Sequence, residues 1–323
     1  MTRIFEKMAF IFPGQGSQSV GMGRDLAEEY KTCREIFNQA DEILGFNLTK
    51  IMWEGPVDDL NDTVNTQPAL FVHSIAALKL MNNEFPDLKP ELIAGHSLGE
   101  ISALVCAQAI SFENGLKLVR KRGESMKKAG KESPGGMAAI LGLDVEIMDK
   151  ICAQVSSEDS IVQVANDNCP GQIVISGDKT ALERAMELAK AHGARKIRPL
   201  AVSIAAHSRL MDSAWTDFKM AIDETIPFEN AKVPIISNVK ARPMDDAQEL
   251  KNDILAQLNS RVRWTESIKF IHSSGINEFI EIGNGNVLTG LLKRIEEKCS
   301  GFAFGDLSNV AAFRSAMDVS TSM

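Results

Sequence analysis

A serine lies between two glycines in the segment AGHSLGE (residues 94–100), where the apolar run ELIAG passes into a helical pattern. The spacing Gly95-x-Ser97-x-Gly99 at a strand-to-helix junction is typical of a nucleophile elbow, because small neighbours allow a sharp turn that exposes the serine hydroxyl. The following helix would direct backbone N–H groups toward a developing oxyanion. The alternative is that Ser97 only caps that helix. The strand before it and the helix after it favour a nucleophile.

A serine of ordinary acidity needs a general base, and the chain contains five histidines. Four of them have positions that a helical or neighbouring role explains: His73, His96, His192 and His272. His207, in VSIAAHSRLM, follows a strand pattern and precedes a helical one, which is a loop position suited to a site. Its alternative role is that of a solvent-exposed residue at a helix start. Elimination favours His207 as the base without showing that it reaches Ser97.

Composition excludes several function classes. The net charge of −8 argues against a nucleic-acid partner, because binding phosphates requires a basic face. No apolar stretch approaches the ~20 residues of a membrane-spanning helix. The start, MTRIFEKMAFIFPGQG, indicates a first strand rather than a signal peptide, since its apolar segment is short and meets Pro and Gly at once. Five scattered cysteines without C-x-x-C spacing argue against a disulfide framework or zinc site and fit a reducing cytoplasm.

Strand and helix patterns alternate along the first part of the chain. MAFIFPG and ELIAGHSLG are apolar runs typical of buried strands. GMGRDLAEEYKTCREIFNQADEIL alternates apolar and charged residues at helical spacing, and QPALFVHSIAALKLMNNE predicts a helix whose proline is near the first turn, where proline is tolerated. This order predicts an α/β fold with a parallel sheet covered on both faces.

The pattern changes between residues 133 and 205. GGMAAILGL and ARKIRPLAVSIA indicate strands, and IVQVANDNCPGQIVISG indicates two strands joined at Asn-Asp-Asn and Pro-Gly. With the helical segments DVEIMDKICAQVSS and KTALERAMELAKAHG, the order is β-α-β-β-α-β, that of the ferredoxin-like split motif. The α/β pattern resumes with VPIISNV and INEFIEIGNG. We therefore expect a small subdomain, 133–205, inserted into a catalytic core made of 1–132 and 206–323.

Several segments together resemble the malonyl-CoA:acyl-carrier-protein transacylases of fatty-acid synthesis. They are FIFPGQGSQSVGMG (10–23), AGHSLGE (94–100), RKRGESM (120–126), NCPGQIVISG (168–177), VSIAAHSRLM (202–211), VRWTESIKFI (262–271) and GNGNVLTGLLKR (283–294). They occur in the family's order over nearly the whole chain, and jointly they are specific where GHSLG alone is not. The family fold is an α/β-hydrolase-like core that carries a ferredoxin-like insert, in agreement with the element pattern.

The resemblance implies catalytic roles for four residues. Ser97 would be the nucleophile that accepts the acyl group, and His207 would be its base and later its acid. The backbone N–H groups of Gln15 and Leu98 would form the oxyanion hole. A Pro-Gly-Gln-Gly loop suits this role, since glycines let the backbone approach a ligand closely.

The resemblance also implies substrate-binding roles. Arg122 would hold the free carboxylate of the malonyl group, because a guanidinium is a planar donor that matches a carboxylate. Its alternative is an ordinary residue on the solvated face of RKRGESMKK. Gln257 would orient His207 through its main-chain carbonyl, and Asn168 would face the site from the small subdomain.

The implied reaction moves a malonyl group from malonyl-CoA to the phosphopantetheine thiol of acyl carrier protein, a transient partner, through a malonyl-serine ester. No metal or other cofactor is expected, since coenzyme A enters as a thioester substrate. Two segments depart from the family pattern: Ile204-Ala205-Ala206 stands where Val-Pro-Ser is frequent, and GNGN where Gly-Pro-Gly is common. The departure at Ile204-Ala205-Ala206 includes a position that is associated with acyl-chain selection in related polyketide domains.

Three other functions stay open. A polyketide-type transacylase would load malonyl or methylmalonyl. An esterase or thioesterase would use the same elbow with water as acceptor, and its acid would come from Asp144, Asp167 or Asp178, which fall in the inserted segment. A non-catalytic module that binds the carrier is the third.

Two basic clusters could meet coenzyme A phosphates or an acidic carrier protein. Solvated faces are the alternative. The clusters are Arg120, Lys121, Lys127 and Lys128, and Arg195, Lys196 and Arg198.

Overall fold

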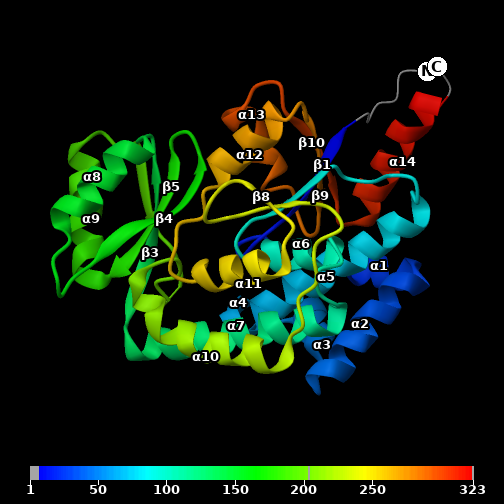
Figure 1. The fold of residues 1–323 in the computed structure, drawn as a ribbon, viewed down its shortest axis with the longest axis horizontal. Helices are drawn as coiled ribbons and strands as arrows, with labels where there is room; N and C mark the ends of the chain where they lie inside the picture. Colours follow the sequence, from blue (N-terminus) through cyan, green and yellow to red (C-terminus); the bar gives the residue numbers. More distant parts are fainter. Residues whose placement is uncertain (1–6, 203, 322–323) are drawn as a thin grey trace.

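A six-stranded sheet lies at the centre of the larger part of the molecule (Figure 1), in a computed structural model that describes residues 7–202 and 204–321. The strand order is β10-β9-β1-β2-β7-β8, and every neighbouring pair is parallel except β7 and β8 at one edge. The strands are β1 (Met8–Phe12), β2 (Leu92–Gly95), β7 (Ile235–Ile236), β8 (Pro243–Met244), β9 (Glu278–Ile282) and β10 (Ser300–Phe304). The α/β class with a parallel sheet, predicted from the sequence, is confirmed.

Helices cover both faces of this sheet, which explains why every residue of β1 is buried. Side chains alternate along the strand, so that Phe10 and Phe12 enter one apolar cluster while Ala9 and Ile11 enter another. The first face is covered by α5 (Thr63–Glu84), α6 (Gly99–Cys106) and α7 (Phe112–Glu132), and the second by α12 (Trp264–Ser273) and α13 (Thr289–Ile295).

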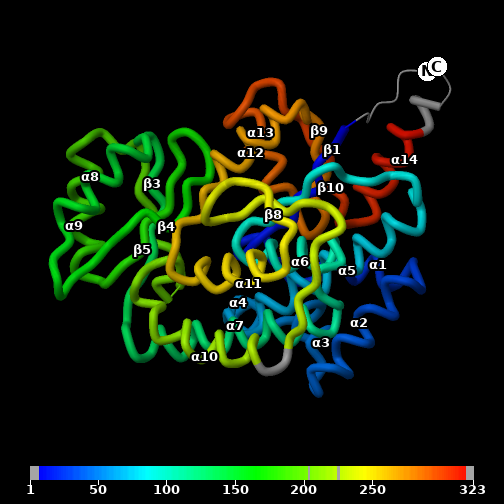
Figure 2. The backbone as a smooth tube through the Cα atoms, in the orientation of Figure 1, coloured from blue at the N-terminus to red at the C-terminus, as the bar shows by residue number. Residues whose placement is uncertain are grey.

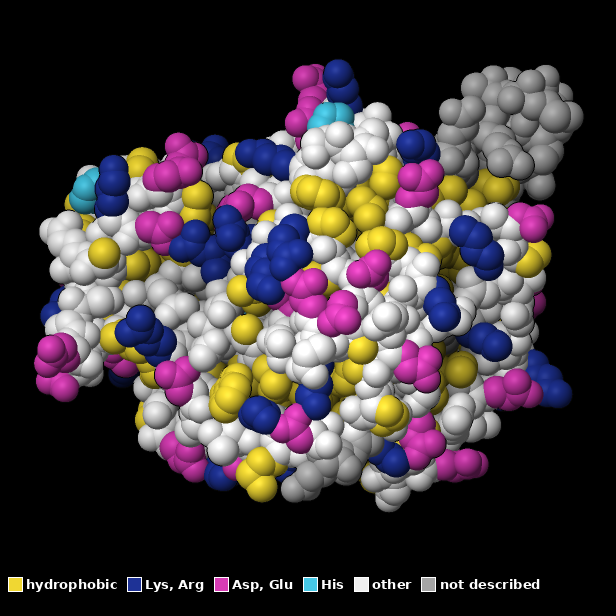
Figure 3. Space-filling view, viewed as in Figure 1, with side chains coloured by type: hydrophobic (Ala, Val, Ile, Leu, Met, Phe, Trp, Pro, Cys, Tyr) yellow, Lys and Arg dark blue, Asp and Glu magenta, His cyan; other side chains and the backbone are white. Residues whose placement is uncertain are grey.

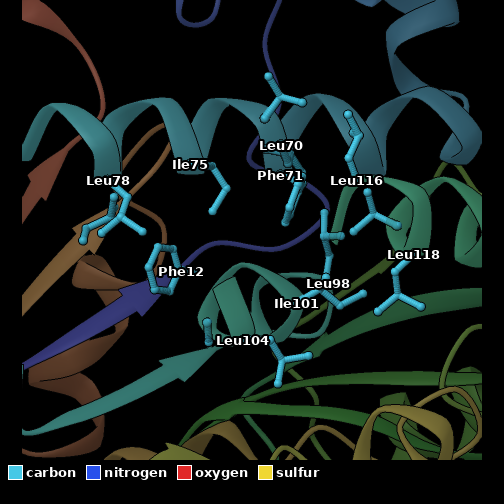
Figure 4. Packing of buried hydrophobic residues seen from close by; sticks show 14 of the residues in the cluster. Phe12, Leu70, Phe71, Ile75, Leu78, Leu98, Ile101, Leu104, Leu116 and Leu118 are labelled. Atoms are coloured by element: carbon cyan, nitrogen blue, oxygen red, sulfur yellow. The ribbon is translucent and has the colours of Figure 1, made fainter. Parts of the chain in front are cut away.

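The first face holds the largest apolar cluster, in which α5 is buried on nearly all sides. Figure 4 shows Leu70, Phe71 and Ile75 of α5 above Leu98 and Ile101 at the start of α6. The side chain of Leu98 therefore belongs to the core, although its neighbour Ser97 is partly exposed.

The helical spacing over residues 21–44 corresponds to two helices in the structure. Tyr30 has φ −110° and ψ 117°, an extended conformation that separates α1 (Arg24–Glu29) from α2 (Lys31–Leu44). The remaining helices are α3 (Leu48–Glu54), α4 (Val57–Asn61), the 3₁₀ turn η1 (Arg209–Met211), α10 (Asp212–Thr225), α11 (Ala247–Ala256) and α14 (Leu307–Thr321). Within the described ranges, no helix is both long and apolar enough to cross a membrane.

The proline of α5 lies deeper in the helix than the sequence pattern predicts. Asp62 caps the helix by accepting a hydrogen bond from Val64 N, so Pro68 falls in the second turn. Proline has no N–H for the carbonyl four residues earlier, which belongs to Val64. Arg120 Nη1 donates to that carbonyl oxygen at 3.0 Å and replaces the missing donor.

The segment predicted to be ferredoxin-like forms a second sheet, of four strands. Its order is β4-β5-β3-β6 with all neighbours antiparallel, as the β-α-β-β-α-β motif requires. α8 and α9 pack on it (Figure 1), and Figure 2 shows the chain entering from α7 and leaving toward α10. The elements are β3 (Gly135–Leu141), α8 (Val145–Val155), β4 (Val162–Cys169), β5 (Gln172–Asp178), α9 (Lys179–Ala191) and β6 (Lys196–Pro199). The division into a core and a subdomain at 133 and 205 stays a prediction.

The polar run Asn-Asp-Asn (166–168) lies inside β4 rather than in a turn, which corrects the sequence prediction. Only Pro170 and Gly171 connect β4 to β5. The register of β4 shifts twice around this run, and the freed backbone pairs with the larger part of the molecule: Asp167 N donates to Val262 O at 3.0 Å, and Val262 N donates to Ala165 O at 2.8 Å. The irregular strand thus pairs with the segment just before α12.

A buried carboxylate on β9 caps α13. Glu281 is fully buried, and its two oxygens accept from Leu288 N at 3.1 Å and Thr289 N at 2.7 Å. Burial raises the pKa of Glu281 to about 7, although these two N–H groups oppose the rise. Because the folded protein then binds a proton that the unfolded chain releases above pH 4.5, stability must fall as the pH rises from about 4.5 through 7.

We expect Glu281→Gln to remove this pH dependence. A shift of one pKa unit corresponds to about 1.36 kcal/mol. Between pH 4.5 and 7, the free energy of unfolding of the unchanged protein should therefore decrease by on the order of 3 kcal/mol more than that of the variant. Urea unfolding at pH 5, 6, 7 and 8 measures the two slopes. Glu278→Gln, which changes a carboxylate at the accessible start of the same strand, is the control. Parallel slopes for the unchanged protein and Glu281→Gln would contradict the assignment.

Candidate active site

Ser97 occupies a strained turn between β2 and α6. Its φ of 51° lies in the left-handed region, which serine seldom adopts. Both flanking glycines are sterically required: a Cβ on Gly95 would lie 2.0 Å from the carbonyl carbon of Gly99, and a Cβ on Gly99 would lie 2.1 Å from Phe12 O. The turn therefore needs the spacing that the sequence shows, and it leaves the Ser97 hydroxyl partly exposed.

A buried asparagine that the sequence reasoning missed supports this turn. Asn238 follows β7, and its side chain accepts from Ser97 N at 2.8 Å and donates to Gly95 O at 2.7 Å. Its own N–H donates to Glu100 Oε1 at 3.2 Å. A polar residue at the carboxyl end of the strand next to β2 was the available signal, since the carboxyl ends of parallel strands share one edge of a sheet.

His207 meets Ser97 although 110 positions separate them in the sequence. The Ser97 Oγ to His207 Nε2 distance is 2.7 Å. His207 Nδ1 lies 2.8 Å from Gln257 O and 3.2 Å from Ser260 O, and both carbonyl oxygens can only accept. Nδ1 must therefore carry the proton, which leaves Nε2 free to accept from the serine hydroxyl.

The surroundings of His207 keep its imidazole neutral. The residue is 3% exposed, and burial together with the neighbouring Arg122 guanidinium lowers the pKa of His207 to about 3. A neutral imidazole with Nε2 toward a hydroxyl is the form that a general base requires. The segment VSIAAHSRLM (202–211) was predicted to contain the base. Ile204, Ala205 and Ala206 are described, whereas position 203 lies outside the described residues.

Arg122 points inward from α7 and is buried, unlike the solvated residue that its basic surroundings would suggest. Its Nη2 donates to Ser97 Oγ at 3.1 Å and to Gln257 Oε1 at 2.8 Å, and its Nη1 donates to Gln67 Oε1 at 3.0 Å. Within the described part of the chain, Nε has no partner. Burial lowers the pKa of Arg122 to about 10, so the side chain stays charged at neutral pH.

The hydrogen-bond partners of Arg122 are all uncharged groups. Glu100 is the anion that acts on it, yet burial and the nearby Asp253 raise the pKa of Glu100 well above its usual range. No hydrogen bond between Glu100 and Arg122 is present among the described residues; the Glu100 oxygens accept from Asn238 N and Gln257 instead. A buried cation without a directly bonded anion next to a nucleophile is suited to hold a carboxylate of a ligand.

Gln257 links these groups through both its main chain and its side chain. The sequence predicted only the carbonyl contact with His207, which the structure contains at 2.8 Å. The side chain also accepts from Arg122 and donates to Ser97 O at 3.0 Å and to Glu100 Oε2. Because Gln257 is 1% exposed, these bonds form in a water-poor environment that fixes its orientation.

Two backbone N–H groups beside Ser97 carry no hydrogen bond to any described residue, those of Gln15 and Leu98. Gln15 lies in the exposed loop after β1, and its side chain contacts Thr63 Oγ1 at 3.5 Å. Leu98 is the N-cap of α6, so its N–H points out of the helix start. Both groups are available to a ligand.

Asn168 reaches the site from β4 and contacts a residue that the sequence reasoning set aside. Its Oδ1 lies 2.8 Å from His96 Nε2, and the His96 ring packs edge-on against Trp264 at 5.5 Å between centroids. His96 thus connects the elbow to the second sheet, while burial lowers its pKa.

The basic cluster near the end of α7 is partly neutralised. Lys127 pairs with Asp62, and Lys128 pairs with Asp217 at 2.6 Å. On the face drawn in Figure 3, Lys and Arg side chains lie among Asp and Glu side chains. This cluster is therefore a weaker anion-binding surface than the sequence alone suggests.

Across the described ranges, no group of three His, Cys, Asp or Glu side chains is placed to hold a metal ion.

Comparison with known proteins places the chain beside acyl-transfer enzymes. The family model for the acyl transferase domain matches residues 9–303. The malonyl CoA-acyl carrier protein transacylase of Bacillus subtilis (strain 168) is 45% identical over 300 residues, which are 93% of this chain and 94% of that protein. The crystal structure of an acyl carrier protein S-malonyltransferase from Vibrio cholerae O1 aligns with a TM-score of 0.91 and 42% identity over 95% of this chain and 99% of that one. A malonyl-transacylase in complex with its type II PKS acyl-carrier protein aligns with a TM-score of 0.91 and 40% identity, over 95% and 98%.

Proposed function

Because this chain belongs to the malonyl-CoA:acyl-carrier-protein transacylase family, we propose that its site performs malonyl transfer with Ser97 as nucleophile and His207 as base. The enzyme is an acyltransferase that moves the malonyl group from malonyl-CoA to acyl carrier protein in fatty-acid synthesis. One observation carries the assignment of the site: Ser97 Oγ lies 2.7 Å from a neutral imidazole and 3.1 Å from a buried guanidinium with uncharged partners.

The first half-reaction forms a malonyl-serine ester. Ser97 Oγ attacks the thioester carbonyl carbon while its proton passes to His207 Nε2. The N–H groups of Gln15 and Leu98 donate hydrogen bonds to the oxyanion of the tetrahedral intermediate. The carbon–sulfur bond then breaks, and the departing sulfur of coenzyme A takes the proton from His207. The imidazole returns to its neutral form.

The second half-reaction repeats these steps in reverse with a different thiol. The phosphopantetheine thiol of the carrier protein gives its proton to His207 and attacks the ester carbonyl, and Ser97 leaves with that proton. A thioester is converted to an ester and back, so no electrons are transferred and the chemistry needs neither a metal nor a redox cofactor. A cytoplasmic location fits both substrates.

Arg122 gives this site its preference for a carboxylate-bearing acyl group. The malonyl carboxylate would give this guanidinium a directly bonded anion, which its present hydrogen-bond partners do not supply. Asn168 and His96 would border the same site from the side of the second sheet. We regard residues 133–205 as the inserted subdomain that contributes this border.

An esterase is less consistent with this arrangement. Nδ1 of His207 is held by the carbonyls of Gln257 and Ser260 rather than by a carboxylate. Of the three candidate acids, Asp167 is bonded instead to Thr265 at 2.8 Å, and Asp178 caps α9. Arg122 would also have no ligand to bind.

The test is to follow the acyl group through both half-reactions. Malonyl-CoA alone should add one malonyl group to the protein by intact-mass analysis, and holo acyl carrier protein should then remove it and become malonylated. Carrier protein without its phosphopantetheine arm is the control and should leave the ester in place. Free malonate as the main product would instead indicate a hydrolase.

The carrier could also belong to polyketide synthesis, since one similar structure contains a type II PKS acyl-carrier protein. Transfer rates to a fatty-acid carrier and to a polyketide carrier, measured with the same malonyl-loaded enzyme, distinguish the two acceptors.

A further inference from the structure

The loop that contains Gln15 (residues 13–20) has no regular secondary structure, so its position depends on a few contacts. At its start, a Cβ on Gly14 would lie 2.4 Å from His96 O, which shows how closely the loop packs against the elbow. Gly16 has φ 106°, a conformation that glycine tolerates, and its N–H donates to Gln18 Oε1 at 2.7 Å. Gln18 in turn donates to Asn61 Oδ1 at 2.8 Å. These bonds hold the loop on the side of α4.

The opposite side of the loop is held by one residue from the far end of the chain. Asn284 Nδ2 donates to Ser17 O at 2.6 Å and to Ser19 Oγ at 3.0 Å, across 267 and 265 positions of sequence. Ser17 is two residues after Gln15, so this contact fixes the backbone next to the proposed oxyanion donor. Both distances lie within hydrogen-bonding reach, and the one to Ser17 O is short for an N–H···O bond.

Asn284 is itself held in place by the residues around it. Gly283 has φ 142°, and a Cβ there would lie 2.7 Å from Pro13 Cγ, so the two loops are in close contact. On the other side of Asn284, Glu281 binds the N–H groups of Leu288 and Thr289 and closes the loop over residues 283–287. The bend after β9 therefore presents the Asn284 amide to the Gln15 loop.

We propose that Asn284 is a positioning residue for acyl transfer, which holds the Gln15 N–H at the place where the oxyanion forms. The proposal rests on the proposed function, since it assigns a purpose to the loop that contains Gln15. An oxyanion donor must lie within about 2.7–3.1 Å of the developing charge, and a displacement of about 1 Å can cost on the order of 100-fold in rate. Asn284 stands in GNGN, where the similar family commonly has Gly-Pro-Gly, and proline has no side-chain donor. A proline at this position could not make the contact.

The test compares two substitutions of identical chemistry on one loop. Asn284→Asp keeps the shape of the side chain but removes both donated hydrogen bonds, because a carboxylate only accepts. Asn286→Asp adds the same charge two residues later, at an exposed side chain that has no hydrogen bond to the described residues. Asn284→Ala removes the donors without adding charge, and Asn284→Gln retains a donor.

The readout is the single-turnover rate of Ser97 acylation by malonyl-CoA and by acetyl-CoA. We expect Asn284→Asp and Asn284→Ala to slow acylation by about tenfold or more with both thioesters, with the KM for malonyl-CoA within about twofold of normal. Asn286→Asp should leave the rate unchanged, and Asn284→Gln should recover part of it. Equal rates for the two Asp variants, a change in KM alone, or a loss confined to malonyl-CoA would each overturn the proposal. Absence of acylation in the unchanged protein would instead refute the proposed function.

Discussion

Replacing Ser97 with alanine is expected to abolish covalent loading by malonyl-CoA and to reduce malonyl transfer to the carrier protein by on the order of 10⁶-fold, the loss found when the catalytic serine of a serine protease is removed. The physical reason is that, among the residues that the structure describes, no other hydroxyl shares its contacts. Ser97 Oγ combines a 2.7 Å approach to a neutral imidazole with partial exposure to solvent. Intact-mass analysis and a steady-state transfer assay measure the two effects.

His207→Ala separates the nucleophile from its base. That variant keeps the Ser97 hydroxyl and should still form the malonyl ester, only slowly, whereas Ser97→Ala should form none. Ser273→Ala, at an exposed serine at the end of α12, is the control for the loss of a hydroxyl and should load normally. An adduct of normal yield on the Ser97→Ala protein would identify a different nucleophile and contradict the site.

The parts of the fold that repeat a simple pattern could be predicted from the sequence. β1 and β2 are short apolar runs between turn residues, and parallel strands covered on both faces have that pattern. The β-α-β-β-α-β order of the second sheet was also visible. The break at Tyr30 was not, because residues on both sides continue the same amphipathic spacing. The polar run inside β4 looked like a turn, because its partner Val262 is almost 100 residues away.

In the site, too, the residues fixed by local spacing could be predicted and those brought in by the fold could not. Ser97 could be identified because its geometry needs the local spacing of Gly95 and Gly99. The hydrogen-bonding residues around Ser97 come from distant segments of the chain, and no local sequence pattern predicts them. Asn238 reaches Ser97 N, and the Gln257 side chain reaches Arg122, only because the sheet brings the ends of different strands and helices together. The burial of Arg122 was equally hidden, since its neighbours in RKRGESM are charged.

Replacing Arg122 with alanine is expected to change which acyl group the enzyme accepts. Malonyl loading should fall by about 10- to 150-fold, which corresponds to the roughly 1.5–3 kcal/mol of a charge-assisted hydrogen bond. Acetyl loading should change far less, because an acetyl group has no carboxylate for the guanidinium to bind. The measurement is kcat/KM for Ser97 acylation by each thioester, and the ratio of the two values is the quantity of interest.

Two further variants separate recognition of the carboxylate from support of the fold. Arg120→Ala removes an arginine two residues earlier on α7 that has no hydrogen bond to Ser97, His207 or Gln257, so it should leave the malonyl-to-acetyl ratio unchanged. The contacts of Arg120 are Glu124, Val64 O, Asn65 and the Phe46 ring. Arg122→Lys keeps the charge but cannot reproduce the planar set of donors, and its ratio should lie between those of the unchanged protein and Arg122→Ala. Arg122→Ala also leaves amide oxygens without a donor, so thermal unfolding must accompany the kinetics. A loss shared equally by malonyl and acetyl would show that the guanidinium serves only to orient Ser97, because a group that binds the carboxylate must discriminate between substrates that have one and substrates that do not.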